Sequence, residues 1–366
     1  MAVYGLGAFV GTFFGGRFTD RFGFYYVQLI SLLLSGAFLL LLQFVTNFYA
    51  LCGSVFVFTL FGDAFRPANQ AAIAHYSEAD NRTRAFSLNR LAINLGWSVG
   101  GGLGGWLAGI DYKLLFWADG LTCLAAGMVL WLFLPQPTIL PSHTPGALAS
   151  YQLSSETAEI TLPHRDLPFL GVVACNALFL IAFMQFFTLV PLFFGKVLNL
   201  TKGVIGLLMA LNGMLVATVE MALVYALEAQ KPSKISLITQ GIVLTALSFV
   251  VLSLPGWSAQ LGLDSVGITL SGLGIGVGYV ILATTSEMLV MPFIQSLTVE
   301  RSQPATRGQY LALYAMSAAL AQTIAPVFGS LMVAQFGFTT HWLAIAVLSL
   351  VSAGGFWLLG KKMRVQ

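Results

Sequence analysis

Long apolar runs, separated by short polar or glycine- and proline-containing connections, follow one another along almost the whole chain. A helix needs about 20 mostly apolar residues to cross a membrane. The pattern predicts such helices at 24–44, 48–74, 84–109, 113–134, 168–194, 203–226, 234–254, 266–291, 306–334 and 338–359, after a shorter apolar run at 2–15. These runs lack the alternation of polar and apolar residues that is typical of β-barrel strands. The sequence therefore predicts an all-α polytopic membrane protein with eleven transmembrane helices.

The composition points to lipid as the solvent. Only 8% of the 366 residues are charged and 57% are hydrophobic, whereas about 25% charged residues is usual for a soluble protein. The net charge of +3 is too small to indicate a nucleic-acid partner. Cys52, Cys123 and Cys175 lie singly within apolar runs, which argues against a disulfide framework, a metal site or a redox motif. We therefore expect a protein in the lipid bilayer that works without a metal or a cofactor.

The distribution of lysine and arginine predicts the orientation, because these residues are retained on the cytoplasmic side of a membrane. Alternate connections carry most of them: Arg17, Arg21, Arg82, Arg84, Arg165, Lys231, Lys234, Arg301, Arg307, Lys361, Lys362 and Arg364. The remaining connections carry only Lys113, Lys196 and Lys202. We therefore expect an integral protein of the plasma (inner) membrane, with a cytoplasmic C-terminus and with Met1 outside.

The longest connection, 135–167, is rich in proline, serine and threonine, which is typical of a linker. It predicts two helical bundles, 1–134 and 168–366, joined by a cytoplasmic linker. A weak internal repeat supports two related halves, because a shift of 225 residues (284 − 59) aligns Thr59 with Thr284, Pro67 with Pro292 and Gln70 with Gln295. The helix at 168–194 has no counterpart in the first half. We therefore expect two pseudo-symmetric halves of six helices, of which this chain lacks the first helix.

A glycine-flanked charged segment, Gly16-Arg17-Phe18-Thr19-Asp20-Arg21-Phe22-Gly23, stands between the first two runs. It resembles the loop signature G-x-x-x-D-R-x-G of the major facilitator superfamily. The resemblance covers essentially the whole chain and implies the major facilitator fold, whose two halves give alternating access to a central site. It also implies a gating role for the loop residues Gly16, Asp20, Arg21 and Gly23.

A second similarity lies in the helix at 84–109. Its stretch Gly96-x-x-x-Gly100-Gly101-x-x-Gly104-Gly105 is similar to the antiporter signature G-x-x-x-G-P-x-x-G-G of that superfamily, with Gly101 at the proline position. The repeat partner keeps the proline. The resemblance implies the drug/proton antiporter-like subgroup. Because small residues at this spacing permit close helix contact, we expect a helix-packing motif formed by Gly96, Gly100, Gly104, Gly105, Pro326 and Gly329.

Several charged and polar residues fall within the predicted spans, where an ionised group costs about 2.5–3.5 kcal/mol on insertion scales. Glu287 has no basic residue within one helical turn, so we expect it to bind a proton reversibly, with Asp63 as a second candidate. The alternative for Asp63 is that it only neutralises Arg66, and the alternative for Arg90 is that it snorkels to the interface. Shared helix faces and shared depth suggest a substrate cavity formed by Thr59, Arg66, Gln70, Arg90, Asn94, Gln185, Asn212, Thr284 and Gln295.

The leading functional prediction is a monomeric secondary active transporter that exports small amphipathic compounds, as in multidrug efflux, in exchange for protons. One alternative is proton-coupled uptake of a small metabolite by a symporter, which Gly101 leaves open. Another is a truncated, non-transporting relic or sensor, suggested by the missing helix. An enzyme is not expected, because counting along the helices places Asp63 and Asp119 at different depths, too far apart to form a protease dyad.

Overall fold

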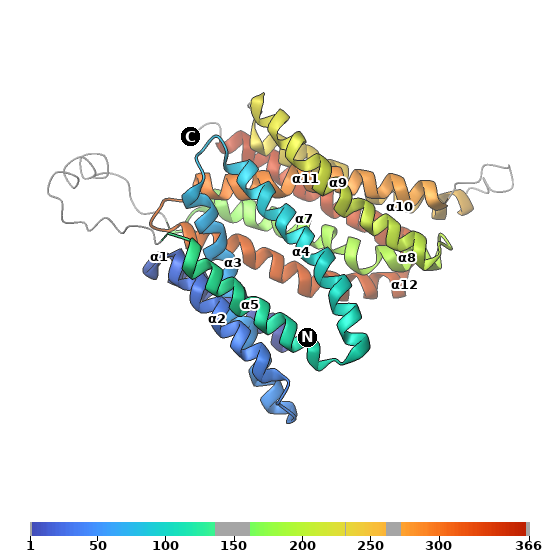
Figure 1. Ribbon diagram of the computed structural model, residues 1–366. Coiled ribbons are helices and arrows are strands. Elements are labelled where there is room, and N and C mark those ends of the chain that lie inside the picture. The colour runs from blue at the N-terminus through green and yellow to red at the C-terminus, as the bar shows by residue number, and fades with distance from the viewer. Residues whose placement is uncertain (1, 136–161, 231, 261–271, 364–366) are drawn as a thin grey trace. The chain divides into compact units, whose positions relative to one another are not determined.

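In the computed structural model, the described residues are 2–135, 162–230, 232–260 and 272–363. Every regular element within them is a helix (Figure 1). The helices of this part are α1 (Ala2–Phe22), α2 (Phe24–Leu42), α3 (Phe48–Tyr76), α4 (Arg82–Ile110), α5 (Lys113–Phe133), α7 (Leu167–Thr188), α8 (Val190–Lys196), α9 (Lys202–Ala229), α10 (Lys234–Gln260), α11 (Gly272–Arg301) and α12 (Arg307–Met363). The prediction of an all-α chain is confirmed for these residues.

One position divides the helices differently from the prediction. The predicted helix 168–194 is two helices, because α7 ends at Thr188 and α8 begins at Val190 with a proline in its first turn. Proline has no N–H to donate to the preceding turn, so it fits a helix start. The predicted helices 306–334 and 338–359 both lie within α12, where the non-helical backbone of Gly337, with φ 78°, separates two helices at a kink, as the prediction has it. Glycine adopts this positive φ without the steric cost that other residues meet.

The predicted helix 266–291 is wrong at its C-terminal end, because α11 continues to Arg301. The predicted residues 266–271 lie outside the described residues. Pro292 and the polar Ser296 and Thr298 are buried in α11, and the Thr298 hydroxyl donates a hydrogen bond to the Ile294 carbonyl at 2.8 Å. A helix end that contacts protein on its polar side does not need apolar residues, so falling hydropathy does not mark where it stops.

The segment 16–23 also differs from the prediction of a loop. Gly16, Asp20 and Arg21 belong to the last turns of α1, which continues to Phe22. Only Gly23, with φ 85°, departs from helical geometry before α2 begins. The motif therefore forms a helix end and a one-residue turn, and glycine is needed at the turn because its φ is positive.

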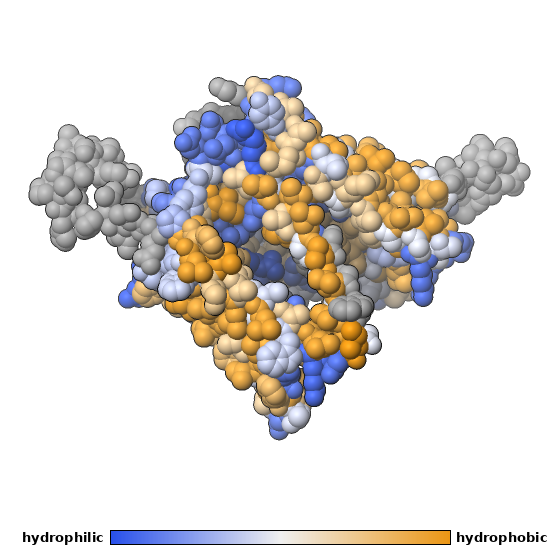
Figure 2. Space-filling model, viewed as in Figure 1, coloured by the Kyte–Doolittle hydropathy of each residue, from blue (hydrophilic) through white to orange (hydrophobic). Residues whose placement is uncertain are grey.

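Eight of the described helices are long and apolar enough to cross a membrane: α2, α3, α5, α7, α9, α10, α11 and α12. Large apolar side chains such as Phe133, Leu207 and Val347 are exposed on these helices, and hydrophobic residues cover much of the face shown in Figure 2. Lipid tails solvate such side chains as well as a protein interior does. These features identify an integral membrane protein, while the cytoplasmic position of its C-terminus stays a prediction.

The described chain divides into two compact units that are interleaved along the sequence. Unit 1 comprises the described residues of Met1–Ala72, Leu107–Asp166 and Ser302–Leu313, and unit 2 those of Ile73–Trp106, Leu167–Arg301 and Tyr314–Gln366. Most of α4 therefore packs in unit 2, together with α7–α11 and most of α12. The predicted bundles 1–134 and 168–366 and the linker 135–167 stay a prediction.

Small residues hold α1 against α3 in unit 1. A Cβ added at Gly11 would overlap the backbone of Leu60, and one added at Gly15 would lie 2.6 Å from the Cα of Ala64. Such contacts let two helix backbones approach closely and gain van der Waals contact, which is a main source of helix association in lipid. The α1–α3 contact therefore depends on glycine at these positions.

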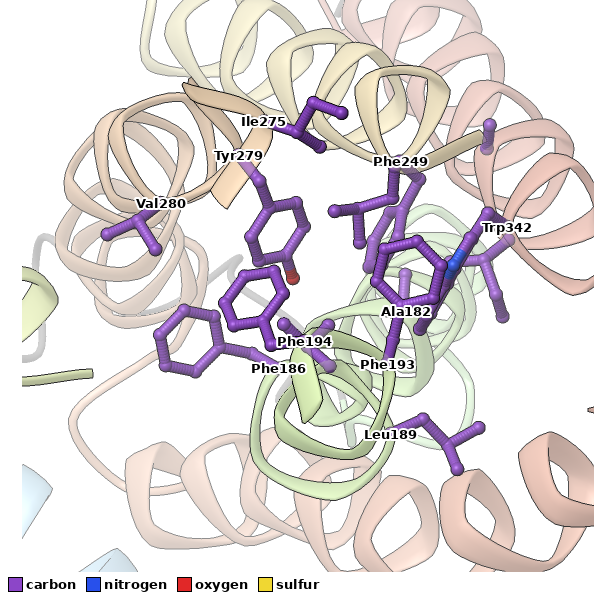
Figure 3. Packing of buried hydrophobic residues seen from close by; sticks show 14 of the residues in the cluster. Ala182, Phe186, Leu189, Phe193, Phe194, Phe249, Ile275, Tyr279, Val280 and Trp342 are labelled. Carbon is purple, nitrogen blue, oxygen red and sulfur yellow. The ribbon is translucent and has the colours of Figure 1, made fainter. Parts of the chain in front are cut away.

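Aromatic rings form the core of unit 2, where helices α7, α8, α10, α11 and α12 meet (Figure 3). Phe249 stacks on Trp342 with ring centroids 5.6 Å apart, and Phe193 meets the same indole edge-on at 5.4 Å. Phe186 stacks on Tyr279 at 6.1 Å. Offset and edge-to-face rings at these distances are favourable arrangements, so this cluster fixes the break between α7 and α8 against the neighbouring helices.

Candidate functional site

A buried charged cluster lies in unit 2 between α4, α9 and α11, with Arg90 of α4 at its centre. Arg90 is only 8% exposed. Its Nη2 donates to the Oε1 atom of Glu287 at 2.6 Å, and its Nη1 donates to the backbone carbonyl of Glu287 at 3.1 Å. Because the guanidinium is planar and rigid, two bonds to one residue fix its orientation. Arg90 therefore binds α11 and does not snorkel to an interface.

Glu287 of α11 has further partners. Its Oε2 atom accepts a hydrogen bond from Asn212 Nδ2 of α9 at 2.9 Å, and the same amide nitrogen lies 2.9 Å from the Thr284 hydroxyl. Thr284 and Glu287 are three residues apart, so they lie on one face of α11. Glu287 is 6% exposed, and both of its carboxylate oxygens are bonded. The sequence shows no basic residue within one turn of Glu287. In the structure, Arg90 of another helix contacts its carboxylate.

Glu220 of α9 is the third charged member and is 1% exposed. Its Oε2 atom lies 3.6 Å from Arg90 Nη2. The Ser87 hydroxyl of α4 is a further polar neighbour, but neither carboxylate oxygen of Glu220 accepts a hydrogen bond of good geometry among the described residues. The cluster therefore combines one guanidinium with two buried carboxyls that are bonded very differently.

A second contact joins the same two helices nearer one end. Arg84 Nε of α4 lies 2.9 Å from Glu228 Oε2 of α9, and the Arg84 guanidinium lies 5.5 Å from the centroid of the Tyr225 ring. The partner on α9 changes from Glu228 to Glu220 as the α4 position advances from Arg84 to Arg90, so the two helices run antiparallel. At 1.5 Å per residue, the two levels are about 9–12 Å apart. An arginine of α4 thus faces a glutamate of α9 at each of two levels.

Unit 1 contains a different charged group. Arg66 Nε lies 2.6 Å from Asp63 Oδ1, so these residues of α3 neutralise each other, as the simpler prediction has it. The pair lines a cavity of about 530 Å³ that Asp119 and Cys123 of α5 also line. Asp63 and Asp119, which counting along the helices places at different depths, both line this cavity.

Asp20, at the end of α1, binds the N-terminus of α12 within unit 1. Its carboxylate accepts hydrogen bonds from the backbone N–H groups of Gly308 at 2.6 Å and Gln309 at 3.0 Å. Free N–H groups and the helix dipole make such a terminus a favourable anion site. Burial raises the pKa of Asp20, which lies outside the apolar run 2–15, and the two N–H donors oppose that shift.

The helices that Asp20 joins also approach closely. A Cβ added at Gly308 would lie 2.5 Å from the Gly16 carbonyl oxygen, and one added at Gly16 would lie equally close to the Gly308 carbonyl oxygen. The segment with the superfamily-like signature therefore contacts a helix terminus that is distant in sequence. Its gating role stays a prediction.

Residues 1–290 match the family model described as Major Facilitator Superfamily. The chain belongs to the major facilitator superfamily. No curated protein matches it. The subgroup and the missing first helix stay predictions.

Two solved structures show the fold of this superfamily protein. One is the human organic anion transporter MFSD10 (TETRAN), with a TM-score of 0.73 and 15% identity over 97% of this chain and 82% of that one. The other is the proton:xylose symporter XylE bound to 6-bromo-6-deoxy-D-glucose, with a TM-score of 0.69 and 16% identity over 97% of this chain and 84% of that one. At these identities, the likeness shows the fold alone. Members of the superfamily are transporters rather than enzymes, which makes this chain a membrane transporter of small molecules.

The residues of the predicted cavity of this superfamily member belong to both units. Arg90, Asn212 and Thr284 surround Glu287 in unit 2, whereas Thr59, Asp63, Arg66 and Gln70 belong to unit 1. The other three predicted residues are Gln185, Gln295 and Asn94. Gln185 of α7 donates to the Ala325 carbonyl of α12 at 3.2 Å, Gln295 lies next to Tyr314, and Asn94 is partly buried on α4.

The glycines of the predicted helix-packing motif also differ in their surroundings. A Cβ added at Gly329 would lie 2.8 Å from Gln185 Oε1, so Gly329 lies in a tight α7–α12 contact. By contrast, no described heavy atom would lie within 4 Å of a Cβ at Gly96 or Gly100. The packing role predicted for these two glycines is therefore absent from this part of the structure, because no described neighbour covers their face of α4.

The sequence places Glu220 within a predicted span but does not assign it to the site. It stands alone in the apolar run 203–226, with no charged residue within one turn. That isolation is itself a usable signal, because an acid in a membrane span is costly unless it is partnered or neutralised.

Proposed function

We propose that this transporter couples substrate export to protons through the buried cluster of Arg90, Glu220 and Glu287. The observation that supports the proposal is the unequal number of acids and bases in a nearly water-free position. With all three groups ionised, the cluster carries a net negative charge. A proton on one carboxyl removes that charge. Proton binding at such a site changes the forces between α4 and its neighbours, which is what coupling requires.

Helix α4 lies in the predicted first half of the chain, whereas α9 and α11 lie in the predicted second half. If these halves move against each other during alternating access, the bonds of Arg90 and Arg84 to α9 and α11 must break and reform. A protonated carboxyl attracts a guanidinium less than a carboxylate does. Proton binding would thus favour separation of the halves, and proton release would favour contact.

Small amphipathic compounds are the proposed substrates. The cavity in unit 1 combines apolar walls, such as Leu32, Leu39 and Phe58, with polar groups that include Asp119 and Thr122. A cavity of this kind suits a molecule with one apolar side and one polar end. Uptake by a symporter is the second candidate, supported by Gly101 in place of the antiporter proline and by the fold shared with a proton:xylose symporter.

The test is transport by the purified chain in liposomes that carry a pH gradient, with ethidium as an amphipathic probe and xylose as a metabolite probe. We expect ethidium to move in the direction opposite to the protons, and we expect this movement to stop when an uncoupler is added. Glu287→Gln should lose gradient-driven transport but retain ethidium exchange, because exchange needs no net proton movement. Glu300→Gln, on the same helix and paired with Lys234, is the matched control. Ethidium transport that is unchanged by the uncoupler, or a Glu287→Gln protein with normal coupling, would contradict the proposal. Uptake of xylose together with protons would favour the symporter.

A further inference from the structure

The two acids of the buried cluster are not equivalent. Glu287 receives Arg90 at 2.6 Å on one oxygen and Asn212 at 2.9 Å on the other. Glu220 has the same guanidinium nitrogen at 3.6 Å, beyond hydrogen-bond distance, and no described donor of good geometry. A carboxylate deep in a protein needs donors for its oxygens, whereas a neutral carboxyl needs fewer. The bonding pattern therefore suits an ionised Glu287 and a protonated Glu220.

The groups around Glu220 support this assignment. The polar and charged groups of the cluster and its surroundings come from four helices and are Ser87 and Arg90 of α4, Asn212 of α9, Thr284, Glu287 and Gln295 of α11, and Tyr314 of α12. Arg90 is the one cation among them, and it is already bonded to Glu287. A second ionised acid would therefore have no cation of its own among the described residues.

We propose that Glu220 is the carboxyl that takes up and releases the coupled proton, while Glu287 holds Arg90 in place. The inference rests on the proposed proton coupling and names the proton site within it. The proton moves from water onto a Glu220 oxygen and later leaves to water, and Arg90 keeps its own proton throughout. When Glu220 loses its proton, the new carboxylate attracts the Arg90 nitrogen that otherwise bonds Glu287.

This exchange requires little movement, because one atom, Arg90 Nη2, faces both acids. The guanidinium has five N–H donors, so it can turn toward Glu220. Glu287 then still accepts the hydrogen bond from Asn212. Deprotonation of Glu220 thus adds a direct bond between α4 and α9 beside the Arg84–Glu228 contact. Protonation removes that bond, and α4 is then held at this level by α11 alone.

The experiment that tests this proposal is infrared difference spectroscopy of the purified full chain between two pH values, which detects the C=O stretch of carboxyls that gain a proton. It needs no substrate. We expect Glu220→Gln to lack one band that the unaltered protein and Glu300→Gln both show. A Glu220→Gln spectrum that matches the unaltered protein would overturn the assignment. Should Glu220→Gln fail to fold, Ser87→Ala is expected to shift the same band, since it removes the neighbouring hydroxyl, and an unshifted band would also contradict the proposal.

The liposome assay separates this inference from the proposed function. Glu220→Gln should lose gradient-driven ethidium transport while exchange continues. If the unaltered protein transports without a proton gradient, the proposed function is wrong whatever the infrared result. If it is proton-coupled and Glu220→Gln remains so, only the assignment of Glu220 is wrong.

Discussion

Arg90 is the residue whose loss the buried cluster can least tolerate. It is the cation that both Glu220 and Glu287 face, and all three side chains are nearly inaccessible to solvent. Replacing a buried pair by apolar groups can be neutral, but removing one partner leaves an uncompensated charge. The cost of a substitution at Arg90 therefore measures how much the two acids depend on it.

Arg90→Met keeps a long apolar stem and removes the charge. We expect it to lower the free energy of unfolding by about 3–5 kcal/mol, because it leaves two buried acids without a cation. Thermal and denaturant unfolding of the detergent-solubilised protein measures this. Arg84→Met is the control, because the Arg84 side chain is 35% exposed and such pairs contribute only about 0–1 kcal/mol. Equal losses in the two variants would show that the cluster is not buried as described.

At this scale, the sequence supplies helix faces and depths but not contacts between helices. Periodicity and charge select Arg90, Asn212, Thr284 and Glu287, and the structure places these four together. The sequence could not show that Arg90 bonds Glu287, because the two residues are far apart along the chain. The same lack of tertiary information hid Glu220, whose significance follows from its neighbours rather than from any motif.

The crossing of α1 and α12 leaves no room for one added methyl group. Gly16 and Gly308 face each other there, and the carbonyl oxygen of each occupies the space that a Cβ of the other would need. Asp20 then bonds the first N–H groups of α12. Close backbone approach and anion binding at the helix terminus thus depend on the same geometry.

We expect Gly16→Ala to destabilise the folded protein by about 1–3 kcal/mol, the usual range for overpacking a tight contact. Thermal unfolding is the measurement. Gly53→Ala in α3 is the matched control, because no described heavy atom would lie within 4 Å of its Cβ. There alanine should be neutral or should stabilise the helix by up to about 1 kcal/mol. A Gly16→Ala protein as stable as the control would mean that the two helices separate at no cost.

Element types follow from the sequence more reliably than element ends. Lipid excludes every spanning structure but helices and closed barrels, so apolar runs suffice to predict helices. The ends depend on neighbours: α11 extends past Pro292 because its polar end is buried against protein. The kink of α12 depends on the φ of Gly337, and most other glycines among the described residues lie in regular helix.

For the whole molecule, the sequence leads to the superfamily and its fold but leaves the arrangement of its parts open. The all-α membrane class follows from the composition and from the long apolar runs, and the charged motif at 16–23 points to the family that the comparison confirms. The units of the structure are interleaved along the chain, which no linear pattern reveals. A transporter visits more than one arrangement, so its sequence must be compatible with contacts that exist in only one of them.

The final prediction concerns alternating access as a single equilibrium. Asp20 joins α1 to α12 within unit 1, and Arg84 joins α4 to α9 within unit 2. If both contacts exist in only one of two global states, each substitution shifts the same equilibrium by its own free energy. Asp20→Asn should weaken anion binding at the helix terminus by about 1–2 kcal/mol, and Arg84→Gln should cost about 0–1 kcal/mol.

The measurement is the maleimide labelling rate of Gln295→Cys on α11, in a protein whose three native cysteines are replaced by serine. We expect the double variant to shift the population by the sum of the single shifts, within about 0.5 kcal/mol, because the two contacts share no residue. The pair Arg90→Met and Glu220→Gln should instead be strongly non-additive, since these side chains face each other. A double variant of Asp20 and Arg84 that shifts no further than the larger single variant would show that the two contacts open in separate steps.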